Sequence, residues 1–169
     1  MPSTARQTLF ARIGVTEFLG EYIFRDLDIR SAGKTTKEIA ESFLEWTRDK
    51  SGSLVVCQDG IGRDIADKLA AGSNGRTVQS VRLSVYMPGD KTFANMKALA
   101  YSTIEGLLTH RGIHFLTQNH REEMDEYFAS NVVTLTTDNR IRYEKSRIGN
   151  LTILALTVAA HLQRNPSQQ

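Results

Sequence analysis

Apolar and polar residues alternate along the first part of the chain. Residues 8–15 and 21–29 both place apolar side chains at about every second position, and Gly20 lies between the two runs. A period of two is typical of half-buried strands, and a glycine between two such runs favours a turn. The pattern therefore predicts an antiparallel pair of strands.

A helical pattern begins at Thr35. Thr35 and Glu38 have the spacing of a capping box, in which a hydroxyl and a carboxylate accept hydrogen bonds from backbone amides that the helix start leaves free. The apolar residues that follow share one helical face. They are Ile39, Ala40, Phe43 and Trp46. We therefore expect a helix that packs one side against a sheet and ends at residues 51–52.

The middle of the chain has the order strand, glycine turn, helix, strand. Residues 53–57 form a continuous apolar run, which is typical of a strand buried on both faces in the middle of a sheet. A turn with Gly60 and Gly62 follows, then helical spacing over 65–70 and a further strand at 77–83. This order predicts a βαβ crossover and a partly parallel sheet.

The last part of the chain predicts helices around a hairpin. The expected elements are a helix from Lys91 to Gly112, an extended segment at 113–116, a helix at 121–128, strands at 132–136 and 140–144, and a helix at 151–162. Asp138 and Asn139 are turn formers at the tip of the hairpin. The last helix is apolar nearly all round, so we expect it to be mostly buried.

Length and composition narrow the class of protein. The 169 residues, 40% of them apolar and 24% charged, predict one globular domain over residues 1–163 with a tail at 164–169, and the order of the elements makes it α/β. Cys57 is the single cysteine, which excludes an internal disulfide and a thiolate-rich zinc site. No apolar run is long enough for a membrane span, so we expect no membrane partner and an intracellular protein. The net charge of +2 means that any basic surface must be local.

The order of these elements resembles a known nuclease family. The motifs are the strand, acid, Gly-x-Gly turn and helix of residues 55–69, the segment 93–98 with Tyr101, and residues 112–116, 140–145 and 155–160. Together they are similar to the C-terminal ribonuclease-H-like nuclease domain of the large terminase subunit of tailed phages. The resemblance implies a mixed sheet flanked by helices, double-stranded DNA as partner, and a protein that is cytoplasmic in the host cell or associated with the virion.

The resemblance also implies a site for two divalent ions, Mg²⁺ or Mn²⁺, held by at least three carboxylates. Residues 8–29 resemble the family's second and third strands, so the first acid is either absent or replaced by Glu17. The second acid falls on Cys57, with Asp59 two residues later as the substitute and metal ligand. No carboxylate follows Glu144, where the third acid is expected. The sequence therefore predicts a degenerate metal site with Glu17, Asp59 and Asp64 as the remaining catalytic candidates.

A purely structural role is the alternative to metal binding for Asp59, Gly60 and Gly62. In that interpretation the two glycines make a tight turn and let the helix approach closely.

Basic residues gather near the hairpin. They are Arg140, Arg142, Lys145 and Arg147. Arg140 and Arg142 are expected to point to the same side of an exposed strand, and arginine forks suit phosphate oxygens. The alternative is a solvated hairpin face with no partner.

Three hypotheses follow for the function. The first is a packaging-related DNA-interacting module with a degenerate nuclease fold, which acts by binding or assembly. The second is an active metal-dependent DNA endonuclease with an altered acidic site. The third is a structural or regulatory module that binds only protein. The sequence has no complete phosphate-loop motif, so a packaging role would need a separate ATPase, and a sheet without its first strand favours a homo-oligomer or another partner chain.

Overall fold

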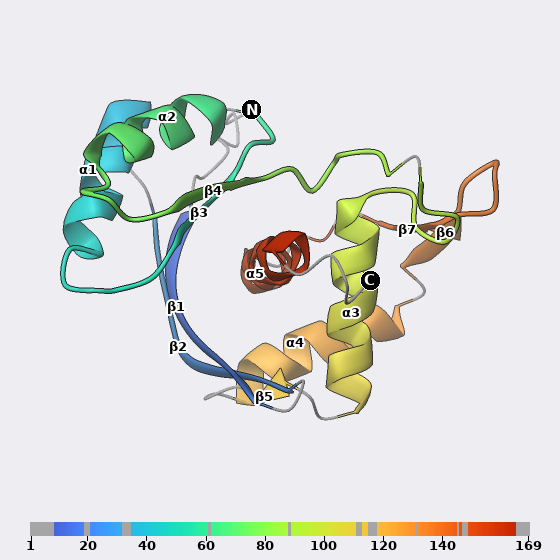
Figure 1. Ribbon diagram of the computed structural model, residues 1–169. Coiled ribbons are helices and arrows are strands. Elements are labelled where there is room, and N and C mark those ends of the chain that lie inside the picture. The colour runs from blue at the N-terminus through green and yellow to red at the C-terminus, as the bar shows by residue number, and fades with distance from the viewer. Residues whose placement is uncertain are drawn as a thin grey trace, which may run out of the picture.

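The computed structural model describes residues 9–18, 21–31, 35–60, 62–87, 89–110, 113–114, 118–130, 132–144, 146 and 149–164. These residues form a mixed α/β fold with five helices and small sheets (Figure 1). None of the helices in this part of the chain is both long and apolar enough to span a bilayer.

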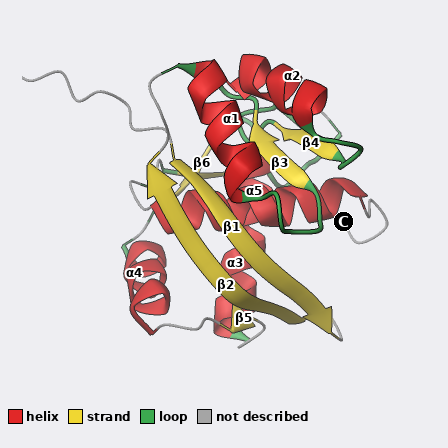
Figure 2. Cartoon of the chain, turned by 90° about the vertical axis from the view of Figure 1, so that its left-hand side faces the viewer, coloured by secondary structure: helices red, strands yellow, loops and turns green. Residues whose placement is uncertain are grey.

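The predicted antiparallel pair is confirmed. Strands β1 (Leu9–Phe18) and β2 (Glu21–Ser31) pair antiparallel, with a register shift between Gly14 and Val15. The short strand β5 (Ile113–His114) adds to β2 in parallel. The long hairpin lies across one side of the molecule, in front of the helices α3 and α5 in Figure 2.

Helix α1 (Thr36–Trp46) begins with the predicted capping box. The Thr35 hydroxyl accepts from the Glu38 amide, and the Glu38 carboxylate accepts from the Thr35 amide at 3.0 Å. The helix ends earlier than predicted, at Trp46. At this end the Arg76 guanidinium, which comes from far along the chain, donates to the Thr47 carbonyl at 2.9 Å and so satisfies a carbonyl that the helix leaves free.

The predicted βαβ unit is confirmed. Strand β3 (Leu54–Cys57), helix α2 (Gly62–Gly72) and strand β4 (Val78–Val81) follow one another, and the two strands pair in parallel. Within β3, Leu54 and Val56 are buried and their neighbours are half-buried. In the described part of the chain β3 pairs with β4 and with no other strand, so a central position in a larger sheet is not observed.

Helix α3 (Met96–Thr109) begins five residues later than the predicted start at Lys91. Asp90 Oδ1 accepts hydrogen bonds from the amides of Thr92 and Phe93 at 2.7 and 2.8 Å. The Asn95 side chain then caps the helix by accepting from the Ala98 amide at 2.9 Å. A side-chain turn therefore competes with the helix over residues 91–95, as is usual for Asp and Asn.

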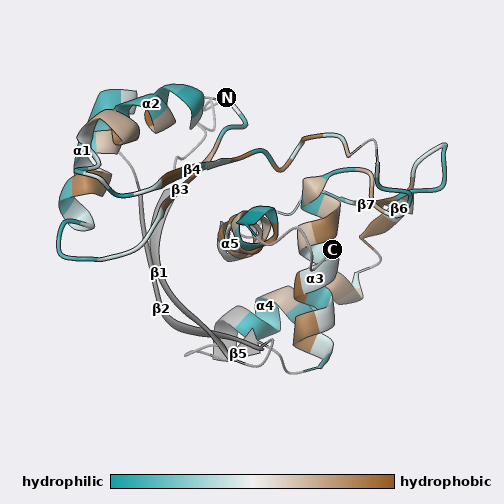
Figure 3. Ribbon diagram, viewed as in Figure 1, coloured by the Kyte–Doolittle hydropathy of each residue, from teal (hydrophilic) through white to brown (hydrophobic). Residues whose placement is uncertain are grey.

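The remaining elements surround the main core. They are α4 (Gln118–Ala129), β6 (Val133–Leu135), β7 (Ile141–Tyr143) and α5 (Gly149–Arg164). The predicted hairpin is confirmed as an antiparallel β6–β7 pair, with Asn139 at a φ of 59°. Helix α5 is mostly buried, as expected, and packs on α3. Figure 3 shows apolar colour on α3, α5, β3 and β4, whereas the loop at the tip of the hairpin is hydrophilic.

Two tyrosines attach the hairpin to the helices. The Tyr143 hydroxyl donates to Glu105 Oε2 on α3 at 2.6 Å, and the Tyr127 hydroxyl donates to the Glu144 carbonyl at 2.7 Å. Burial and the bond to Glu105 raise the pKa of Tyr143 to about 12. Strand β7 therefore has a fixed position relative to α3 and α4.

We predict that Gly62→Ala destabilises the fold by about 2–3 kcal/mol, because an added methyl group has to displace backbone. A Cβ at Gly62 would lie 1.6 Å from the Cys57 carbonyl oxygen at the end of β3. Gly106→Ala is the matched control. A Cβ there meets nothing within 4 Å, so replacing this interior glycine of α3 should stabilise by about 0.5–1 kcal/mol. Urea denaturation of both variants measures the two effects, and an unchanged Gly62→Ala midpoint would contradict the close approach.

Candidate functional site

Asp59 ties two segments together at the carboxyl end of β3. Its Oδ2 accepts hydrogen bonds from the amides of Leu83 and Ser84, both at 3.1 Å, and its Oδ1 accepts from the Ser84 hydroxyl at 2.5 Å. Gly60 follows at a φ of +84°, which lets the chain turn toward α2. The Asp59 carboxylate thus accepts hydrogen bonds from the segment after β4. This is a structural role, which the sequence had left open as the alternative to metal binding.

Cys57 occupies the place where the family resemblance expects an acid. Its thiol is half-buried and donates to Asp59 Oδ2 at 3.8 Å. Burial, the largest effect, raises the pKa of the Cys57 thiol above its ordinary value. The neutral thiol is therefore favoured, and a thiol is no anionic ligand for Mg²⁺ or Mn²⁺.

The other two acidic candidates lie elsewhere in the fold. Asp64 is in the first turn of α2, paired with Lys68 at 2.6 Å, and it also accepts from the Thr36 hydroxyl at the start of α1. The bonds from Lys68 and Thr36 lower the pKa of Asp64. Glu17 lies in β1 opposite Tyr22.

The described acids do not suit a two-metal site. No group of three or more His, Cys, Asp or Glu side chains in the described part of the chain could hold a metal ion. Asp59 and Asp64, whose side chains are described, both already accept hydrogen bonds from protein donors. The described part of the candidate set therefore does not fit a pair of divalent cations, each of which needs several anionic oxygens.

A pocket of about 470 Å³ is lined by the segment after β4, the residues just before α3 and the β6–β7 hairpin. Ser84 and Tyr86, from the segment after β4, line one part of it, and Ala94 and Asn95, just before α3, line another. The rest of the lining comes from the hairpin, from Thr136 to Arg142. Ser84 is also the residue whose amide and hydroxyl Asp59 holds, so Asp59 helps to position the wall of this pocket, which we call the Arg142 pocket.

Arg140 is a buried wall of the Arg142 pocket, which corrects the expectation of an exposed position. Its side chain is only 9% exposed, and its Nε donates to Asp138 Oδ2 at 2.7 Å. The guanidinium carbon lies 4.3 Å from the centre of the Tyr86 ring, and Nη1 reaches the Met87 carbonyl at 3.4 Å. Hydrogen bonds from Thr136 and Arg140 lower the pKa of Asp138, so the ion pair is maintained at neutral pH.

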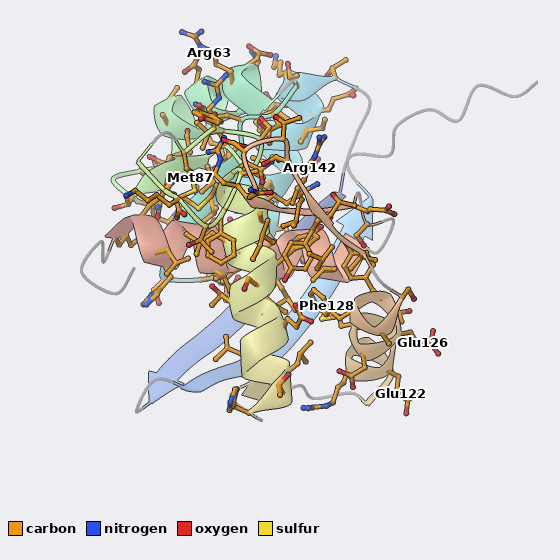
Figure 4. All side chains as sticks on the ribbon, turned by 90° about the vertical axis from the view of Figure 1, so that its right-hand side faces the viewer. Arg63, Met87, Glu122, Glu126, Phe128 and Arg142 are labelled. Carbon is orange, nitrogen blue, oxygen red and sulfur yellow. The ribbon has the colours of Figure 1, made fainter. Side chains whose placement is uncertain are left out.

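The charge of Arg142, unlike that of Arg140, is accessible to a ligand. Both arginines line the same pocket, as expected for positions two residues apart near a strand, but Arg142 is exposed. No side chain in the described part of the chain forms an ion pair or hydrogen bond with its guanidinium. Figure 4 shows Arg142 on the hairpin side of the molecule. Lys145 and Arg147 lie outside the described residues.

Sequence reasoning missed Tyr86, which is 58% exposed. The position of Tyr86 in the sequence could have identified it. Tyr86 follows β4, shortly before Pro88-Gly89, and ligands of parallel sheets bind beyond the carboxyl ends of the strands.

The sequence contains a fragment of the phosphate-loop motif, but the motif is incomplete. Gly33-Lys34-Thr35 is present, but Asp28 stands where the motif requires its first glycine, and the Thr35 hydroxyl caps α1.

The sequence was compared with protein-family models and with curated proteins. No family model matches it, and neither does any curated protein.

We predict that Asp59→Ala lowers the free energy of unfolding by about 0.5–1.5 kcal/mol, because it removes the acceptor of the Leu83 and Ser84 donors. Asp67→Ala is the control, since Asp67 is exposed on α2 and has no hydrogen bond or ion pair in the described part of the chain. Thermal melting followed by circular dichroism compares the two. Equal melting temperatures for both variants would show that the Asp59 contacts carry no stability.

Proposed function

We propose that this chain is a DNA-interacting module of the ribonuclease-H-like type, related to the terminase nuclease domain and acting by binding or assembly rather than by cleavage. The observation that carries the proposal is Arg142, an exposed guanidinium on the wall of the Arg142 pocket. A guanidinium offers paired donors that match phosphate oxygens, and hydroxyl groups nearby can complete the contact. Ser84, Thr136 and Thr137 place such hydroxyl groups in the same pocket.

The arrangement of the elements supports the family part of this proposal. An antiparallel pair, a helix and a parallel βαβ unit follow one another, in the order that the resemblance implies. Within the described residues β1 pairs only with β2, and β3 only with β4. Each therefore keeps an edge that one further strand could occupy, which agrees with a sheet that lacks its first strand.

The use of the acids supports binding over cleavage. Asp59 holds the segment after β4, and Asp64 pairs with Lys68. A carboxylate engaged in this way has to break those contacts before it can coordinate a metal ion. In a packaging role this module would work beside a separate ATPase that supplies the motor.

We predict that Arg142→Ala weakens DNA binding about tenfold, since it removes a charge-assisted hydrogen bond to phosphate. The effect should be the same for all sequences, and the dependence of log affinity on log salt should become shallower by about 0.7–0.9 for each phosphate that the variant no longer neutralises. Fluorescence anisotropy over a salt series measures both quantities.

Arg63→Ala is the matched control for that measurement. Arg63 is also an exposed arginine, but it lies on α2 and projects from a different part of the surface than Arg142 (Figure 4). It should leave affinity and salt slope unchanged. Equally weakened binding in the two variants would mean that binding follows overall charge, and a wild type that binds no DNA at low salt would favour the protein-binding hypothesis.

We further predict that the purified protein does not nick supercoiled plasmid with Mg²⁺ or Mn²⁺, because too few free carboxylates are present at the end of β3 to neutralise two cations. Gel electrophoresis after incubation with either metal tests this. Cleavage that Asp59→Asn abolishes would contradict the proposal and establish the altered endonuclease site.

A further inference from the structure

One face of the Tyr86 ring lies against the Arg140 guanidinium, and much of the remaining surface of the residue is exposed to solvent. The Arg140 guanidinium carbon lies 4.3 Å from the ring centre, yet Tyr86 is 58% exposed. Since the guanidinium covers one face, most of that exposure belongs to the opposite face and the edge. We propose that this free face stacks an unpaired nucleobase, so that the Arg142 pocket binds single-stranded DNA; this rests on the proposed DNA-interacting function.

The backbone that carries the ring is held by neighbouring segments. Tyr86 forms a β-bridge with Asn95, and the Met96 amide donates to the Val85 carbonyl at 3.2 Å. The guanidinium beneath the ring is held in turn by Asp138. A platform held from the backbone and from one face loses little conformational freedom on binding, which favours affinity.

The charges around the ring suit a nucleotide. Asp138 neutralises Arg140, so the cation next to the ring is already compensated and serves mainly to orient it. Arg142, with no such partner in the described residues, lines the same pocket and remains for a phosphate. A stacking face and a phosphate donor are the two elements of single-strand binding sites, and Tyr86 and Arg142 line the same pocket.

Duplex DNA fits this arrangement less well than a single strand does. In a duplex both faces of each base are covered by neighbouring bases, so an aromatic side chain can stack only at an end or after unstacking. The phosphate contact alone remains available to duplex. Stacking on Tyr86 therefore distinguishes single strands from both duplex and bare backbone.

The experiment uses the full chain and three fluorescent probes: a thymidine dodecamer, an abasic dodecamer with the same number of phosphates, and a twelve-base-pair duplex. We expect the thymidine dodecamer to bind roughly 5- to 150-fold more tightly than the abasic one, which corresponds to the usual value of one stacked base. The duplex, in which no base is free to stack on the ring, should bind less tightly than the thymidine dodecamer.

Two substitutions at Tyr86 separate stacking from folding. Tyr86→Leu should lower the affinity for the thymidine dodecamer to that for the abasic probe, with an unchanged salt slope. Tyr86→Phe keeps the ring and should retain the preference. Leu135→Ala is the control, because Leu135 is an exposed apolar residue of the same hairpin, 64% exposed, that does not line the pocket. Circular dichroism melts confirm that each variant is folded.

The possible outcomes distinguish a failure of base stacking on Tyr86 from a failure of the proposed DNA binding. Equal affinity of the wild type for the thymidine and abasic probes, with Arg142→Ala weakening both, would overturn base stacking and leave DNA binding intact. Tighter binding of duplex than of single strand would overturn it in the same way. If none of the three probes binds at low salt, the proposed function fails and this inference fails with it.

Discussion

The irregular segment between β4 and α3 has to satisfy its backbone polar groups without a helix or a sheet, and this constraint determines where the Arg142 pocket lies. At its start, Asp59 accepts from the Leu83 and Ser84 amides. At its end, the Ala94 amide donates to the Ile141 carbonyl at 2.9 Å, and the Ile141 amide donates to the Thr92 carbonyl at 2.7 Å. Buried backbone groups left unpaired are costly, so each of these contacts constrains the segment. The pocket forms where the βαβ unit and the hairpin are held together by this one segment.

The same constraint explains why neighbouring charged residues differ in role. Arg140 enters the space beneath Tyr86, pairs with Asp138 and reaches the Met87 carbonyl, so it holds the hairpin against the segment. Arg142 lies one strand repeat further along and stays exposed. Removing the buried Arg140 side chain would lose these contacts with Tyr86, Met87 and Asp138, whereas an exposed cation can be removed with little effect on stability. Arg140 is thus a positioning residue, and Arg142 is the group available to a ligand.

Local features were predictable from the sequence, and non-local ones were not. The capping box at Thr35 and the hairpin tip at Asn139 depend on residues within four positions, and both predictions are confirmed. The predicted start of the third helix was wrong because the Asp90 turn and the Asn95 cap compete with helix formation, although both residue types favour caps and turns. The burial of Arg140 depends on Met87, more than fifty residues earlier in the chain, and no periodicity carries that information. Of the site, the sequence indicated the basic hairpin, whereas the contact of Tyr86 with it required the fold.

The charge of the pocket also limits what it can do. Since Asp138 compensates Arg140, Arg142 is the cation left uncompensated among the described lining residues, and the whole chain has a net charge of only +2. Attraction between few charges is weak at physiological salt, because ions screen it within about 8 Å. Contacts that do not depend on salt, such as the ring face of Tyr86, then have to supply much of any affinity, and several copies or a partner chain would add to it by holding more than one pocket on the same strand. The DNA binding proposed here therefore fits an assembly, where neighbouring subunits would provide the effective concentration that a single pocket lacks.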